Sequence, residues 1–260
     1  WNDPASEIAF VWIDLLDHSQ AGLAAWFLNA WLETGGDLAA LGVMRFYAVY
    51  RAVVRAKVAA LRAGQEDSEA ALPEVAAARG YLDLAWKIAV PPTPTLVITC
   101  GLSGSGKTTA SSARLLDPAL AGAGSNVRLR SDVERKRLFG LAPHDSSHSA
   151  PDGGIYTPEA TQRTYARLLA LTRDLLRTGW PVIVDAAFLK RAERDSFAAL
   201  AAELGCSFGI LATEAAPEEL RRRLLARSGD ASEATVDVLD RQLEWFEPLS
   251  AAEQSAVVRS

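Results

Sequence analysis

The chain has little cysteine, a single methionine, no excess of basic charge and no long apolar run. Its two cysteines, Cys100 and Cys206, lack the spacing of a metal site and are too few for a disulfide framework. No stretch is long and apolar enough to cross a bilayer, and the N-terminus lacks the charged-then-apolar pattern of a signal peptide. We therefore expect a cytoplasmic protein with no membrane partner.

The net charge of −5 gives no basic field for holding long nucleic acid, although a local basic patch remains compatible with it. The length of 260 residues allows one large domain or two small ones. The chain begins at Trp1, its only methionine is Met44, and Ala256-Val-Val-Arg-Ser260 reads like the start of a strand. We expect a fragment of a longer polypeptide whose N-terminal portion is missing.

A glycine-rich loop is the most informative feature. Residues 101–109 read Gly-Leu-Ser-Gly-Ser-Gly-Lys-Thr-Thr, directly after the apolar run 95–100 and before a helix-forming stretch. This is the G-x-x-x-x-G-K-[ST] pattern in its required context, in which backbone N–H groups and a helix N-terminus hold phosphate. A glycine-rich turn that fits by accident is the alternative. The residues expected to bind ATP are Gly101, Ser103, Gly104, Ser105, Gly106, Lys107, Thr108 and Thr109, with the Thr108 hydroxyl on Mg²⁺.

The chain divides near residue 90. Residues 91–95, Pro-Pro-Thr-Pro-Thr, form a stiff hinge that cannot continue a helix. Residues 1–90 have helical character, with Asp3-Pro4 as a helix start and Gly35-Gly36 as a break. One apolar helix face is expected from Tyr47, Tyr50, Val54, Val58 and Leu61. Five of the seven tryptophans lie here and are expected to pack in the core: Trp1, Trp12, Trp26, Trp31 and Trp86.

After the hinge, strands alternate with helices. The expected strands are 95–100, 127–130, 181–185 and 207–213. The expected helices are 106–116, 132–139, 158–178, 190–204, 217–228 and 232–247, and 142–157 is a long loop. This alternation predicts an α/β fold, a P-loop NTPase parallel sheet over residues 96–260 covered by helices on both faces and preceded by a small all-α segment.

Two acids follow strands of this sheet. Asp185 closes Val-Ile-Val-Asp and is expected to hold Mg²⁺, the alternative being a helix cap. Asp132 starts a helix after 127–130, and capping alone would explain it. It would also lie beside the phosphate loop, where a carboxylate can accept the proton of an attacking hydroxyl. Arg135, one turn on, could bind an anionic or polar acceptor.

An arginine pair and a histidine pair each have a spacing that allows two interpretations. Arg223 and Arg227 lie four residues apart in a basic helix and could close over a transferring phosphate, or form a solvated face. His144 and His148 have a metal-compatible spacing, but they lie in a Pro/Gly/Ser-rich loop without a third ligand, and we interpret them as ordinary loop residues.

Residues 95–260 resemble the P-loop kinases with an AAA domain that are related to polynucleotide kinase, chloramphenicol phosphotransferase and zeta toxin. The resemblance rests on residues 101–109, on Arg130-Ser-Asp-Val-Glu-Arg-Lys-Arg-Leu138, on Tyr156-Thr-Pro-Glu-Ala-Thr161, on Val182-Ile-Val-Asp-Ala-Ala-Phe188 and on the Arg223/Arg227 pair. It implies that Asp132 activates the acceptor and that Arg135 contacts it.

Residues 1–88 resemble the C-terminal helices of an aminoglycoside phosphotransferase, through Trp1-Asn-Asp-Pro-Ala-Ser-Glu-Ile-Ala-Phe10 and Arg45-Phe-Tyr-Ala-Val-Tyr-Arg-Ala-Val-Val-Arg-Ala-Lys57. The catalytic His-Gly-Asp loop and metal-binding Asp of such enzymes are absent from this sequence. The two-part arrangement is similar to bifunctional aminoglycoside phosphotransferase/ATP-binding proteins, and it does not establish an aminoglycoside substrate.

The first functional hypothesis is an ATP-dependent kinase that phosphorylates a hydroxyl of a small-molecule or nucleotide-like acceptor, with Asp132 as base. The alternatives are an ATP-binding regulatory switch without an acceptor, and a toxin-type sugar-nucleotide kinase. Asp132, Arg135 and the arginine pair favour a kinase, because a switch needs none of them. The identity of the acceptor, the oligomeric state and the presence of a second kinase site in a longer protein are not readable.

Overall fold

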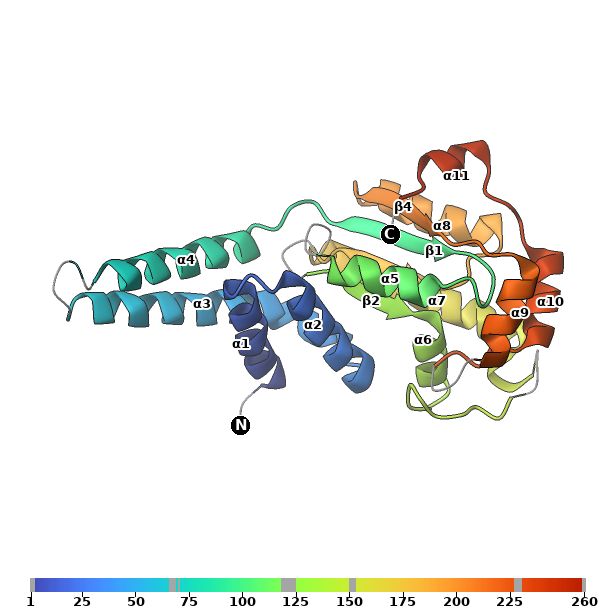
Figure 1. Cartoon of the computed structure of the whole chain (residues 1–260), viewed down its shortest axis with the longest axis horizontal. Coiled ribbons are helices and arrows are strands. Elements are labelled where there is room, and N and C mark those ends of the chain that lie inside the picture. The colour runs from blue at the N-terminus through green and yellow to red at the C-terminus, as the bar shows by residue number, and fades with distance from the viewer. Residues whose placement is uncertain are drawn as a thin grey trace. The chain divides into compact units, whose positions relative to one another are not determined.

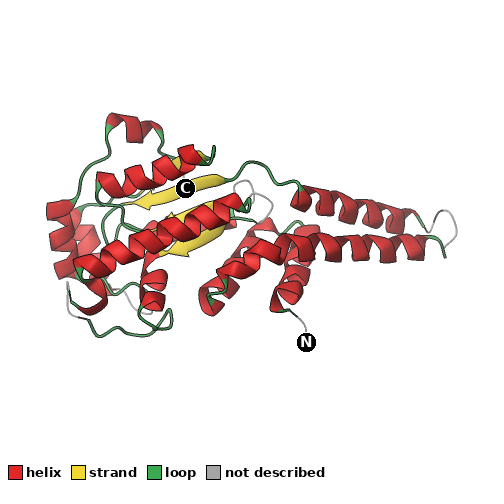
Figure 2. Cartoon of the chain, turned by 180° about the vertical axis from the view of Figure 1, so that it is seen from behind, coloured by secondary structure: helices red, strands yellow, loops and turns green. Residues whose placement is uncertain are grey.

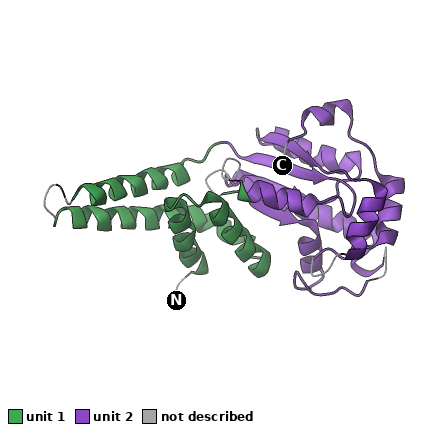
Figure 3. Cartoon of the chain, in the orientation of Figure 1, with its two compact units in different colours: residues 1–92, 116–125 green, residues 93–115, 126–260 purple. Residues whose placement is uncertain are grey.

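The structure is a computed structural model that describes residues 3–65, 69, 71–117, 125–149, 153–226 and 231–258 (Figure 1). The chain forms two compact units, one of residues 1–92 with 116–125 and one of residues 93–115 with 126–260 (Figure 3). The first unit is built from helices, and the second contains the sheet. The predicted domain limits of 1–90, 91–95 and 96–260 stay a prediction.

The helical unit begins where the sequence predicts. α1 (Pro4–Asp17) starts at Asp3, whose carboxylate accepts a hydrogen bond from the Ala5 N–H at 2.9 Å. α2 (Ala21–Gly35) ends at Gly36, which has a left-handed backbone. A short 3₁₀ turn, η1 (Leu38–Ala40), leads into α3 (Leu41–Ala63), and α4 (Leu72–Ala89) packs against α3.

The buried face of α3 differs from the predicted one. Tyr50, Val54, Val58 and Leu61 are exposed, and Tyr47 is only partly buried. The buried residues of the helix are Leu41, Met44, Ala48, Ala52, Ala56 and Ala59. The large apolar side chains suggested the wrong stripe, because small alanines allow α1 and α4 to pack closely against α3.

The tryptophan prediction is correct for Trp12, which is 1% exposed, and wrong for Trp26 and Trp86, which are 55% and 70% exposed. Trp31 is partly buried, and Trp1 lies outside the described residues. Other aromatic rings of this unit stack with arginine: the Arg55 guanidinium lies over the rings of Phe10 and Tyr81.

The sheet of the second unit has the strand order β2-β3-β1-β4, and all of its pairs are parallel. The strands are β1 (Thr95–Cys100), β2 (Val127–Arg130), β3 (Val182–Asp185) and β4 (Ser207–Ala212). They match the predicted ranges to within one residue at each end. The register pairs Leu96 with Val182, and Arg130 with Asp185 at the carboxyl edge.

Helices cover both faces of the sheet, as predicted. Val97, Ile183 and Leu211 point to one face, where Ala110 of α5 (Lys107–Leu116) packs against them. α7 (Pro158–Arg177) and α8 (Arg191–Glu203) contact strands from the other face, and the two opposite views show this arrangement (Figures 1 and 2). The fold is therefore an α/β P-loop NTPase fold.

The remaining helices of this unit are α6 (Ser131–Leu138), α9 (Pro217–Ala226), α10 (Val236–Trp245) and α11 (Ala251–Ser255), and η2 (Gly154–Tyr156) is a 3₁₀ turn. The helix expected at 232–247 begins later, because Thr235 caps α10, and it ends at Trp245, because Phe246 has an extended backbone. Val257 forms a single parallel bridge with Ile210 of β4. In the described part of the chain, no helix has both the length and the apolar character needed to cross a membrane.

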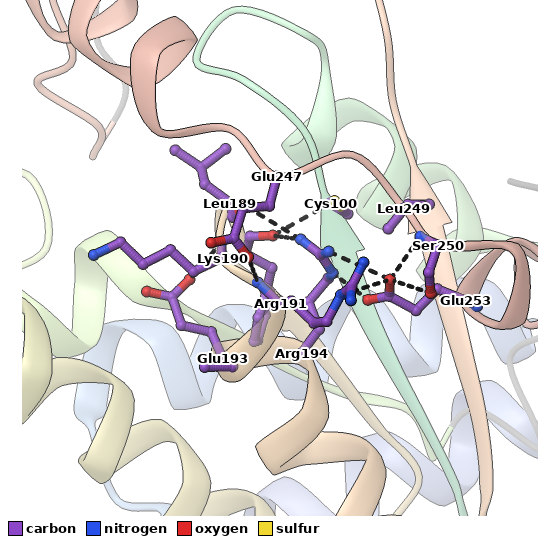
Figure 4. A network of polar contacts seen from close by, with 12 residues as sticks. Cys100, Leu189, Lys190, Arg191, Glu193, Arg194, Glu247, Leu249, Ser250 and Glu253 are labelled. Atoms are coloured by element: carbon purple, nitrogen blue, oxygen red, sulfur yellow. Dashed lines mark hydrogen bonds and ion pairs between the residues drawn. The ribbon is translucent and has the colours of Figure 1, made fainter.

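A buried ion pair holds the segment after α10 onto α8 (Figure 4). Arg194 is 1% exposed and forms two hydrogen bonds to Glu253, while it also donates to the carbonyls of Phe188 and Leu189 at 3.0 and 3.2 Å. The Glu253 carboxylate in turn caps α11 through Ser250. Hydrogen bonds therefore satisfy both buried charges.

Candidate active site

The glycine-rich loop connects β1 to α5 at the carboxyl edge of the sheet. Gly101 has φ +154°, and a Cβ there would lie 2.4 Å from the Thr213 carbonyl oxygen, so only glycine fits. Gly104 has φ +84°, and a Cβ there would lie 2.9 Å from the Leu220 carbonyl oxygen of α9. The Lys107 ammonium donates to the Leu102 carbonyl at 2.8 Å, which folds it over the loop.

Most of the predicted nucleotide-binding residues line one cavity of about 1990 Å³. These are Ser103, Gly104, Ser105, Gly106, Lys107, Thr108 and Thr109. Gly101 lies behind the wall, where its N–H donates to the Ala187 carbonyl. The loop and the start of α5 therefore line a space large enough for a nucleotide and a second substrate.

Asp185 ends β3 and is 5% exposed. Its carboxylate accepts a hydrogen bond from the Ser111 hydroxyl at 3.0 Å, and the same hydroxyl lies 3.1 Å from the Thr108 carbonyl. The Thr108 backbone and the Asp185 carboxylate therefore both contact Ser111, and both residues line the cavity. A hydroxyl and a carboxylate are oxygen ligands of the kind that Mg²⁺ takes, and a metal site of Thr108 and Asp185 stays a prediction.

Asp132 occupies the first turn of α6, and its partly buried side chain lines the same cavity. Burial raises the pKa of the Asp132 carboxyl, Arg135 and Arg130 oppose the rise, and Asp185 adds to it. A hydrogen bond with Ser232 also lowers this pKa. The balance is a carboxyl that binds a proton more readily than an exposed aspartate.

Arg135 is 7% exposed and lies beneath the segment that precedes α7. Its guanidinium donates to the Ile155 carbonyl at 2.9 Å and to the Thr161 hydroxyl at 3.1 Å. It also lies over the Tyr156 ring, 5.1 Å from the centroid. The residue therefore orders residues 155–161, although it still lines the cavity that contains Asp132.

A strap of residues 231–235 crosses α6, and sequence reasoning missed it. The Glu233 carboxylate accepts hydrogen bonds from the Ser147 N–H and hydroxyl, and its Oε1 lies 3.2 Å from the ammonium of the buried Lys136. Ser232 thereby lies against Asp132. No local sequence pattern predicts this contact, because it joins three segments that are distant in sequence.

Arg223 of α9 faces the loop: its guanidinium donates to the Gly104 carbonyl at 3.4 Å and pairs with Glu219. Arg227, its predicted companion, lies outside the described residues. His144 and His148 are exposed. Among the described residues, no group of three or more His, Cys, Asp or Glu side chains is placed to hold a metal ion.

The sequence profile of the AAA domain family matches residues 96–249. The chain belongs to this family. The match covers the phosphate loop, Asp132, Asp185 and Arg223, so this part is a P-loop domain of a nucleotide-binding type. The resemblance of residues 1–88 to an aminoglycoside phosphotransferase stays a prediction.

The uncharacterized protein Rv2004c of Mycobacterium tuberculosis (strain ATCC 25618 / H37Rv) is 30% identical over 247 residues, which are 94% of this chain and 48% of the relative. The chain thus spans about half the length of the curated relatives it matches. A gluconokinase from Sinorhizobium meliloti 1021 is 21% identical, with a TM-score of 0.42 over 64% of this chain and 81% of that one. The Mycobacterium tuberculosis APS kinase in complex with AMPPNP and APS is 24% identical, with a TM-score of 0.41 over 53% and 75%.

Proposed function

We propose that the P-loop domain is an ATP-dependent kinase that transfers the γ-phosphoryl group to a hydroxyl of a small-molecule or nucleotide-like acceptor. The observation that carries the proposal is the position of Asp132, a carboxylate with a raised pKa that lines the same cavity as the phosphate loop. Phosphoryl transfer to an alcohol needs such a group to take the hydroxyl proton, whereas a nucleotide switch does not.

The roles follow from position. The loop N–H groups and the N-terminus of α5 hold the phosphates, and Lys107 leaves the Leu102 carbonyl to bind them. Thr108 and Asp185 would hold Mg²⁺, which neutralises phosphate charge when bound. Arg223 lies at the loop on the α9 side and is suited to stabilising charge on the transferring group, together with Arg227.

In the reaction, the acceptor oxygen forms a bond to the γ-phosphorus while the bond between that phosphorus and the bridging oxygen of ADP breaks. Asp132 accepts the hydroxyl proton. Arg135 and Ser232 act on the acceptor side, since the first orders residues 155–161 and the second hydrogen-bonds to Asp132. The acceptor is therefore selected between α6, the start of α7 and the strap.

The test is a screen of ATP consumption by the purified chain with sugars, nucleosides, nucleotides, short oligonucleotides and aminoglycosides. We expect one class to stimulate ADP release and to become phosphorylated, as mass spectrometry would detect. Lys107→Ala should abolish Mg·ATP binding in calorimetry while circular dichroism stays unchanged. Tight Mg·ATP binding without phosphorylation of any acceptor class would instead identify a switch.

We also propose that residues 1–88 bind no nucleotide. This part of the sequence contains no glycine-rich phosphate loop, and the catalytic residues that its resemblance would require are absent from it. An ATP analogue cross-linked to α1–α4 in the Lys107→Ala variant would contradict this proposal.

A further inference from the structure

Gln242 of α10 reaches the phosphate loop. Its side-chain Oε1 accepts a hydrogen bond from the Ser103 backbone N–H at 2.8 Å. A backbone N–H can only donate, so the amide oxygen must face Ser103 and the amide nitrogen must point elsewhere. Gln242 lines the cavity and is partly buried. No residue in the described part of the chain forms a hydrogen bond with the Gln242 Nε2.

The contact lies at the γ end of the loop. In a loop of this type the lysine reaches the β- and γ-phosphates. Here the Lys107 ammonium is 2.8 Å from the carbonyl of Leu102, the residue next to Ser103. The Lys107 ammonium and the Gln242 amide therefore bind the two ends of the same peptide group, the Leu102 carbonyl and the Ser103 N–H.

Neighbouring contacts fix the position of Gln242. Leu239 of the same helix is fully buried against Leu220 and Leu224 of α9. Arg221 of α9 also pairs with Asp240 at 2.7 Å. α9 also carries Arg223, which donates to the Gly104 carbonyl of the loop at 3.4 Å. The amide nitrogen is thus held near the loop before any nucleotide binds.

We propose that Gln242 distinguishes nucleoside triphosphate from diphosphate: its Nε2 donates to a γ-phosphate oxygen while its Oε1 stays on Ser103. The inference rests on the proposed nucleotide site and assigns a residue that neither the loop motif nor the acceptor-side acids include. In this arrangement α10 contacts the γ-phosphate through Gln242. The packing of α10 on α9 then connects the bound phosphate to α9.

The deciding substitution is Gln242→Glu. A carboxylate oxygen can still accept from the Ser103 N–H, so the anchor of α10 is preserved. The donor is lost, and a negative charge is placed beside the γ-phosphate. Gln162→Glu is the matched control, because it introduces the same charge in the same cavity from the exposed start of α7.

The measurement is calorimetric binding of Mg·AMPPNP and Mg·ADP to the whole chain, with melting curves to verify folding. For Gln242→Glu we expect AMPPNP affinity to fall roughly tenfold or more, as for a lost hydrogen bond to a charged group, and ADP affinity to change less than about threefold. Gln242→Ala should weaken both ligands, and AMPPNP more. Gln162→Glu should leave the ratio of the two affinities unchanged.

An unchanged ratio of AMPPNP affinity to ADP affinity in Gln242→Glu would overturn the inference. The proposed nucleotide site itself would not be contradicted by that result. The same change in the affinity ratio in Gln162→Glu would show that general charge repulsion causes it, and this result would also overturn the inference. Wild-type protein that binds neither ligand would refute the proposed function, and the inference with it.

Discussion

Asp132 can serve as a helix residue and as a base, and the two roles respond differently to substitution. It lies in the first turn of α6, where an acid interacts favourably with the helix dipole. Its burial among Arg130, Arg135 and Ser232 goes beyond what a surface helix start requires. A single amide substitution can therefore separate the two roles.

We expect Asp132→Asn to leave ATP affinity within a few-fold and to lower acceptor phosphorylation by about two to four orders of magnitude, because the amide cannot accept the proton. Thermal stability should change little, since Asn keeps the shape of the side chain and loses only an interaction with the helix dipole of about 0.3–1 kcal/mol. Single-turnover phosphate transfer and a melting curve measure the two effects. Full transfer by the Asn variant would give the base role to another residue, such as Asp185.

The pH dependence of transfer gives a second prediction for the same residue. Since burial raises the pKa of Asp132, the ionised base forms only above the usual titration range of an aspartate. Transfer should therefore be lost as pH falls through this raised pKa, while Mg·ATP binding at the loop persists. Rates at saturating acceptor, measured across the acidic range, should fall at a pH above the ordinary titration range of an aspartate. A fall at or below the ordinary aspartate value would contradict it.

At the scale of elements, the strap depends on the ion pair between Lys136 and Glu233. Lys136 is 1% exposed, and the Glu233 side chain is 23% exposed. Glu233→Gln leaves the buried ammonium without its counter-charge, and we expect the unfolding free energy to fall by about 1–3 kcal/mol, the usual cost of a buried polar group that loses its partner. Lys136→Met in the same background should restore part of the loss. Urea unfolding of the single and double variants measures both.

The matched control for this prediction is Glu219→Gln, which removes the two ion pairs that the partly buried Glu219 forms with the exposed Arg222 and Arg223 on α9. It should leave stability unchanged, because exposed pairs contribute little. A loss of unfolding free energy as large as that of Glu233→Gln would show that the ion pair of Lys136 and Glu233 stabilises the fold no more than the control pairs do.

The sequence predicted most elements of the second unit because several local signals agree there. The glycine-rich loop defines β1 and α5, and short apolar runs ending in polar residues define β2 and β3. The face of α3 was predicted wrongly because its contacts are made by alanines, which periodicity of large side chains overlooks. The strap and Gln242 were missed because hydrogen bonds between distant segments leave no local pattern.

At the scale of the molecule, the pair of Arg194 and Glu253 ties residues after α10 to the sheet unit (Figure 4). Burial alone would raise the pKa of Glu253, but hydrogen bonds from Arg194 and Ser250 outweigh it and lower this pKa to about 2. A carboxyl with a depressed folded pKa stabilises the fold above its unfolded pKa, near 4.5. That stabilisation is lost as pH falls from about 5 towards 2.

We therefore expect the unfolding free energy of the wild type to decline across this acidic window, with Glu253 contributing on the order of 2–3 kcal/mol. Glu253→Gln should be less stable at neutral pH and should show a shallower decline. Chemical denaturation at several pH values between 2 and 7 tests this. Parallel curves for the two proteins would mean that other carboxylates carry the acid sensitivity.

The strand order has a consequence for how the chain folds. α3 and α4 are neighbours in sequence and can pack as soon as both are synthesised, whereas β1 waits for partners that come much later, β3 and then β4. Closing such long loops slows folding. Asp132 follows β2 in the first turn of α6 and Asp185 ends β3, and the pairing of these two strands closes another long loop. Catalytic competence should thus appear late in refolding, well after most helical signal has returned.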